Sequence, residues 1–129
     1  MPAKILPAHI AAAITQEAAK YENSPLRQAR VLGVLASAGY SAREIAGLGG
    51  TPWDRVELRL ALLRLVDEGK GAIDEGALPV DLAGCIARLS EANQRLMLTR
   101  WLRGDFRSAR HAERYALAIE ADEQPQVSF

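Results

Sequence analysis

Residues 41–65 constrain the fold more than any other part of the chain, because they carry the start and stop signals of consecutive helices. Ser41 followed by Glu44 is a capping box, which predicts that a helix begins there. Gly49 and Gly50 predict the end of that helix, since glycine adopts positive φ angles without steric cost. We therefore expect a short first helix followed by a glycine turn.

A second, longer helix is expected after the turn, with Thr51 as its cap and Pro52 at its first position, where no backbone N–H is needed. Val56, Leu60 and Leu63 follow at the i, i+4, i+7 spacing of a buried helical face. Over about residues 41–66, the pattern predicts a helix-turn-helix. Two adjacent helices of an ordinary helical bundle fit the same pattern.

Comparable signals along the rest of the chain predict an all-α, multi-helical fold. A length of 129 residues is typical of one domain, so residues 1–129 are expected to form a single one. The expected helices span about residues 7–21, 26–37, 41–48, 51–68, 78–89, 90–103 and 108–119, and residues 121–129 are expected to be a frayed tail. The expected core includes Leu32, Leu35, Ile45, Val56, Leu60, Leu63 and Ile86.

Catalytic and metal chemistry are not expected, and neither is a cofactor. His9 and His111 are far apart in the sequence and lack neighbours at metal-ligand spacing. Cys85 is expected to be a small core residue, and a single cysteine favours a reducing cytoplasm. There is neither a phosphate-binding loop motif nor a G-x-S-x-G nucleophile motif. No apolar run is long enough to span a membrane.

Charge is unevenly distributed, although the net charge is zero. Between Arg95 and Arg114 there are six arginines and only two acidic residues, within a basic region of about residues 90–120. Arginines spaced three or four apart share a helix face, so this cluster is a candidate phosphate-binding surface. The alternative is a solvated face whose arginines pair with Asp105 and Glu113.

Five short motifs, in this order, resemble the helix-turn-helix domain of the ParB/KorB-like DNA-partition proteins. They are YENSPLRQAR at 21–30, REIA at 43–46 with Gly50 after it, V-x-x-R-L-x-L-L-R-L at 56–65, AIDEGALPVDLAGCIARL at 72–89, and GDFRSARHAERY at 104–115. The family's amino-terminal nucleotide-binding domain, with its G-E-R-R motif, has no counterpart in the sequence, so CTP binding and hydrolysis are not carried over.

The resemblance implies binding of double-stranded DNA in plasmid or chromosome partition or in transcriptional regulation, and a cytoplasmic location on the nucleoid or a plasmid. With Val56 buried, the outward positions of the second helix are Pro52, Trp53, Asp54, Glu57, Leu58 and Ala61. Thr51 and the N–H groups of the helix start are expected to hold a phosphate. The candidate DNA-contacting residues are Arg43, Thr51, Pro52, Trp53, Asp54, Arg55, Glu57 and Leu58, together with Arg100, Arg103, Arg107 and Arg110.

The composition of the outward face supports an alternative function. DNA bases are usually contacted by Arg, Lys, Asn or Gln, whereas this face is acidic and apolar. The alternative is therefore a protein-interaction module in which Trp53 and Leu58 dock a partner or a second copy of the chain. Trp53 could also have a purely structural role, with its ring folded over the edge of the core. Likewise, Arg55 and Arg59 could form ion pairs within their own helix and not contact DNA.

Overall fold

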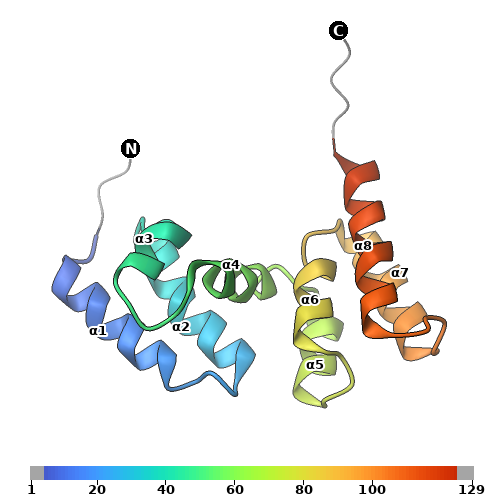
Figure 1. The fold of residues 1–129 in the computed structure, drawn as a ribbon, viewed down its shortest axis with the longest axis horizontal. Coiled ribbons are helices and arrows are strands. Elements are labelled where there is room, and N and C mark those ends of the chain that lie inside the picture. The colour runs from blue at the N-terminus through green and yellow to red at the C-terminus, as the bar shows by residue number, and fades with distance from the viewer. Residues whose placement is uncertain (1–4, 125–129) are drawn as a thin grey trace, which may run out of the picture. The chain divides into compact units, whose positions relative to one another are not determined.

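A computed structural model describes residues 5–124, and within that range the α-helix is the regular secondary structure, without a strand (Figure 1). The all-α class predicted from the sequence is confirmed. The helices fall into two compact units, one up to Leu63 and one from Arg64 onward. The helices are α1 Ala8–Ala19, α2 Pro25–Ser37, α3 Ala42–Gly47 and α4 Trp53–Leu62 in the first unit, and α5 Asp67–Asp74, α6 Val80–Ile86, α7 Glu91–Leu102 and α8 Ala109–Glu123 in the second.

The first unit is built around α2, which packs against both α1 and α4, while α3 packs against α4. Leu32, Leu35, Ile45 and Val56 form its buried core as predicted. Leu62 is fully buried, whereas the predicted core residue Leu60 is only partly buried. Leu63, also expected in the core, is partly exposed at the end of α4.

The short helix α3 begins and ends as its sequence predicts. The Glu44 N–H donates to Ser41 Oγ at 3.1 Å, and the Ser41 N–H donates to Glu44 Oε1 at 3.0 Å, which completes the capping box. Gly49 and Gly50 follow with φ angles of 96° and 92°. A Cβ on Gly50 would also lie 3.2 Å from the Thr15 carbonyl oxygen, so this turn needs glycine for its backbone angle and for its close approach to α1.

The prediction of one long helix over residues 51–68 is wrong, because α4 ends at Leu62 and a separate helix α5 begins at Asp67. The buried side chain of Gln94 stabilises the break. Its Oε1 accepts from the Val66 N–H at 2.8 Å, and its Nε2 donates to the Arg64 carbonyl at 3.2 Å. These bonds satisfy backbone groups that a continuous helix would satisfy internally.

Gly69 and Gly71, which directly follow the expected end of that long helix in the sequence, lie inside α5 instead. At Gly69, a Cβ would lie only 2.6 Å from Leu65 Cγ, so the glycine allows α5 to fold back closely against the preceding segment. A glycine is therefore needed at position 69 for close packing, and it does not end a helix.

The second unit has its own buried residues on α6, α7 and α8. The helices expected over residues 90–103 and 108–119 form as α7 and α8. Ser90 and Ser108 cap them, accepting from the N–H groups of Asn93 and His111 at 3.4 and 3.1 Å. Leu96 and Leu117 are 47% and 48% exposed. The buried residues of this unit include Leu78, Leu82, Ile86, Leu89, Gln94, Met97, Leu98, Phe106, Ala112 and Ala116.

The tail was expected to fray from residue 121, but α8 continues to Glu123. The Glu123 carboxylate accepts from the Ser90 N–H and hydroxyl, each at 2.9 Å, and from the Asn93 side-chain amide. The Asn93 bond first, and then the Ser90 bonds, hold the pKa of Glu123 below its ordinary value. Residues 125–129 of the expected tail lie outside the described range.

Candidate nucleic-acid interface

Helix α4 begins one residue later than the sequence suggested. Its N-cap residue is Pro52, with φ −62° and ψ 152°, so Thr51 is not the cap and Pro52 is not the first helical residue. The Thr51 side chain turns inward instead. The residue is only 6% exposed, and its Oγ1 has no hydrogen-bond partner among the described residues.

The outward face of the first turn of α4 is accessible. Pro52, Trp53, Asp54 and Glu57 are exposed as predicted. Leu58 is half-buried and so contributes less to this surface than expected. The predicted outward position of Ala61 is wrong, because Ala61 is buried where α4 continues into the unit.

Trp53 and Arg43 form one composite surface from two helices. The Arg43 guanidinium on α3 lies 4.3 Å from the centre of the Trp53 ring on α4, a cation–π arrangement. Trp53 remains 40% exposed, so it is not folded into the core. The stack fixes an aromatic ring and a positive charge together next to the start of α4.

The two other arginines of α4 have partners in the first half of the unit. Arg55 makes an ion pair with Glu22, in the connection between α1 and α2, so the intrahelical alternative is wrong. Arg59 is 7% exposed, and its Nε donates to Gln28 Oε1 at 2.7 Å. The Gln28 amide in turn donates to the Ala18 carbonyl at 3.0 Å. Arg59 therefore faces α2 and is removed from the outward face.

Glu22 and Gln28 were not identified from the sequence. Gln28 carries a usable signal, since it precedes the buried Leu32 and Leu35 at helical i, i+4, i+7 spacing, and a polar residue on an apolar stripe indicates a buried hydrogen bond. Glu22 lies in a turn, where no periodicity relates it to Arg55 thirty-three positions later.

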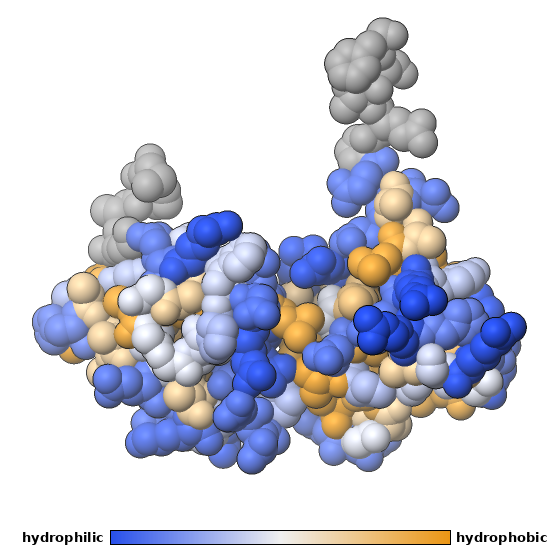
Figure 2. Space-filling view, viewed as in Figure 1, coloured by the Kyte–Doolittle hydropathy of each residue, from blue (hydrophilic) through white to orange (hydrophobic). Residues whose placement is uncertain are grey.

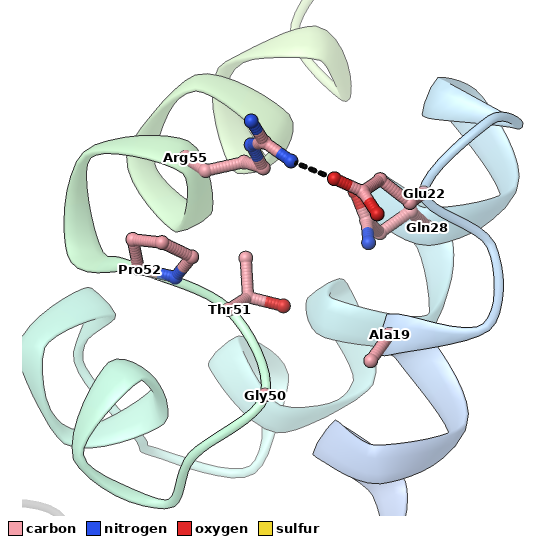
Figure 3. A pocket seen from close by; sticks show the side chains of 7 residues that line it. All are labelled: Ala19, Glu22, Gln28, Gly50, Thr51, Pro52 and Arg55. Carbon is pink, nitrogen blue, oxygen red and sulfur yellow. Dashed lines mark hydrogen bonds and ion pairs between the residues drawn. The ribbon is translucent and has the colours of Figure 1, made fainter.

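A pocket of about 200 Å³ lies beside the start of α4 (Figure 3). Its walls come from the end of α1, the α1–α2 connection, the first turn of α2 and the glycine turn before α4. The Arg55–Glu22 ion pair spans the space between α4 and the α1–α2 connection (Figure 3). The lining residues are Ala19, Glu22, Gln28, Gly50, Thr51, Pro52 and Arg55.

In the second unit, two of the four candidate arginines share one carboxylate, which offsets one of their two positive charges. Asp105 Oδ2 lies 2.6 Å from Arg103 NH2 and 3.5 Å from Arg100 Nε. The hydrogen bond from Arg103 is the main reason that the pKa of Asp105 is lowered. Arg100 also stacks on Phe106 and Tyr115, at 4.9 and 4.6 Å from the ring centres. For Arg100 and Arg103, the alternative interpretation is therefore correct, in which arginines of this face pair with Asp105.

Arg107 and Arg110 differ from that pair. Both are exposed, as is Arg114, and none of the three has an ion pair with another described residue. Strongly hydrophilic side chains gather over α8 on the face drawn in Figure 2. The expected pairing of this face with Glu113 does not occur within residues 5–124. Among the arginines of this candidate surface, those without an ion pair therefore lie in α8 and just before it.

Side chains that could bind a metal or act as a nucleophile are few among the described residues. No group of three His, Cys, Asp or Glu side chains in the described range is arranged to hold a metal ion. Cys85 is half-buried and not fully in the core, and burial raises the pKa of its thiol. Between residues 5 and 124, no helix combines the length and apolar character needed to cross a membrane.

Comparisons of the chain with protein-family models, with curated proteins and with solved structures found no match.

Proposed function

We propose that the first unit binds double-stranded DNA, with α3, the glycine turn and α4 acting as a helix-turn-helix. One observation carries the proposal: a capped six-residue helix and two positive-φ glycines lead into a ten-residue helix whose first turn is exposed. In helix-turn-helix proteins, the amino-terminal residues of the second helix contact bases in the major groove. The motif resemblance to ParB/KorB-like proteins supports the same function, with partition or transcriptional regulation as the proposed role.

The chemistry of the exposed turn limits what it would recognise. Asp54 and Glu57 are hydrogen-bond acceptors, so the base they suit is cytosine, whose N4 amino group donates in the major groove. Positive charge beside them comes from Arg43, which stays next to Trp53. Binding would therefore combine few direct base contacts with phosphate contacts around them.

A second candidate function rests on the exposed Trp53. A tryptophan that keeps 40% of its surface exposed beside an exposed proline is a typical protein-contact residue. In this case, the same turn of α4 would dock another protein or a second copy of the chain, and DNA binding would have been lost.

Two substitutions separate these functions, Glu57→Gln and Trp53→Ala. Glu57→Gln removes a charge at nearly constant shape, so DNA binding predicts a changed affinity, with relaxed specificity of about 1–3 kcal/mol at one base pair if Glu57 contacts cytosine. Protein docking predicts that Trp53→Ala weakens association by about 2 kcal/mol or more. The measurements are a DNA titration and sedimentation of the full chain.

Glu75→Gln is the matched control, because it removes an exposed carboxylate from the other unit. A thermal melt of each variant checks that the fold is retained. If both variants stay folded and neither DNA binding nor association changes, the outward face of α4 has neither function.

A further inference from the structure

One buried polar atom in the wall of the pocket lacks a partner. Thr51 Oγ1 is buried and has no hydrogen-bond partner among the described residues, although a hydroxyl can both donate and accept. Buried polar groups in folded proteins nearly always have a hydrogen-bond partner, so an exception calls for an explanation. In Figure 3 the hydroxyl points into the space between Ala19 and Gln28. A bound group in the pocket would supply the missing partner.

The charged side chains of the pocket are one arginine and one glutamate, which pair with each other. Arg55 holds the Glu22 carboxylate there, and the two side chains are 43% and 63% exposed. An exposed ion pair contributes little to stability, and its carboxylate is readily hydrated when released. The site thus already places one oxyanion against Arg55, and a second oxyanion can take its place.

The start of α4 adds to the same preference. The pocket lies at the amino-terminal end of a ten-residue helix whose N-cap, Pro52, provides no side-chain cap. Backbone N–H groups at a helix start favour negative charge. A volume of about 200 Å³ falls below that of typical pockets for drug-sized ligands but exceeds what one water molecule needs.

We propose that this pocket binds a phosphate group, held by the Thr51 hydroxyl and the Arg55 guanidinium in exchange for the Glu22 carboxylate. The phosphate group can come from free phosphate or from a nucleic-acid backbone, and the chemistry of the site is the same for both. The proposal does not rest on DNA binding, because free phosphate alone tests it.

The test is a titration of the full-length chain with sodium phosphate, against sodium chloride at equal ionic strength, followed by amide chemical shifts. We expect saturable shifts at residues 50–55 with phosphate only. Thr51→Val should weaken phosphate binding roughly tenfold, since a hydrogen bond to a charged group is lost. Arg55→Gln should abolish it. Glu22→Gln should strengthen it about two- to fivefold, because the competing carboxylate is removed.

Two control variants accompany these. Thr99→Val changes an exposed threonine of α7, and Glu17→Gln removes an exposed carboxylate of α1 that pairs with Lys20 outside the pocket. Both should bind phosphate like the unmodified chain. Shifts that do not saturate, or an affinity unchanged by both Thr51→Val and Arg55→Gln, would overturn the proposal.

Thermal melting adds a signature that a structural role for Thr51 would not give. Removing an unpaired buried hydroxyl should leave the Tm without phosphate unchanged or raise it. A folded Thr51→Val protein with a lowered Tm would mean that the hydroxyl has a structural partner, and the pocket assignment would fail.

A parallel titration with duplex DNA separates the two sources of phosphate. If free phosphate saturates the pocket but DNA does not bind, the phosphate site stands and the proposed DNA function fails. If DNA binds without any effect of Thr51→Val and free phosphate gives no saturation, the DNA function stands and the phosphate site fails.

Discussion

Arg59 and Gln28 show how single polar residues set the buried face of α4. The guanidinium is buried because the Gln28 side chain accepts its Nε–H at 2.7 Å, and a buried charge needs such a partner. The face of α4 that packs inward therefore runs through Val56, Arg59 and Leu62. An apolar pattern alone favoured Leu60 and Leu63, because it assigns every charged residue to the solvent side.

This shift of the buried face predicts different costs for two neighbouring leucines. Leu62→Ala should lower the free energy of unfolding by about 2–5 kcal/mol, as expected for a fully buried leucine. Leu60→Ala should cost less, since Leu60 is partly exposed. Chemical denaturation of both variants measures the difference. An equal or larger cost at Leu60 would contradict the orientation of α4.

The sequence was sufficient to predict where a helix begins if the helix has a capping signal. It was not sufficient to predict where a helix ends if contacts with residues distant in the sequence decide that end. The Ser41, Ser90 and Ser108 starts all follow from local sequence. The break between α4 and α5 does not, because it depends on Gln94, twenty-eight residues after Val66. The residues of the pocket at α4 were likewise predictable only in part. Thr51 and Arg55 were candidate binding residues from the sequence, whereas Glu22 was not.

The end of α8 gives a prediction about pH. The pKa of Glu123 is lowered in the folded chain, so its carboxylate bonds stabilise the fold fully above its ordinary pKa of 4.5 and are lost as pH falls through the lower folded value. Glu123→Gln should therefore lower the Tm at neutral pH.

The Tm difference between the unmodified chain and Glu123→Gln should shrink as pH falls below about 4.5. The carboxylate is then protonated first in the unfolded chain and, at lower pH, in the folded chain as well. Melting curves from pH 7 to pH 3 measure it. A Tm difference that stays constant over this range would mean that Glu123 stabilises the fold without its charge. No Tm difference at neutral pH would mean that the hydrogen bonds from Ser90 and Asn93 to Glu123 do not stabilise the fold.

At the scale of the whole molecule, a net charge of zero means that any attraction to nucleic acid must be local. Composition and capping signals were sufficient to predict an all-α chain. They were not sufficient to predict which arginines stay free, since Asp105 bonds Arg103 and Arg100 but leaves Arg107 and Arg110 exposed. That distinction arises from the turn between α7 and α8, which places one carboxylate next to two guanidinium groups.

If the chain binds DNA, these arginines should differ in their contribution. Arg110→Ala should weaken binding about equally for all sequences and lower the slope of log affinity against log salt by about one. Arg103→Ala should have a smaller effect, because that guanidinium is already paired with Asp105. Titrations at several salt concentrations measure both slopes. An unchanged slope for Arg110→Ala would mean that Arg110 is only solvated and does not contact DNA phosphates.

The most direct test of DNA binding by the first unit is a filter-binding titration of the full chain. The duplex is one enriched from a random library, the comparison duplex is its scrambled sequence, and both are measured at two salt concentrations. We expect the enriched duplex to bind roughly 10³-fold more tightly than the scrambled one, and both affinities to fall as salt rises. Equal affinity for the two duplexes, or no binding even at low salt, would contradict the proposed function.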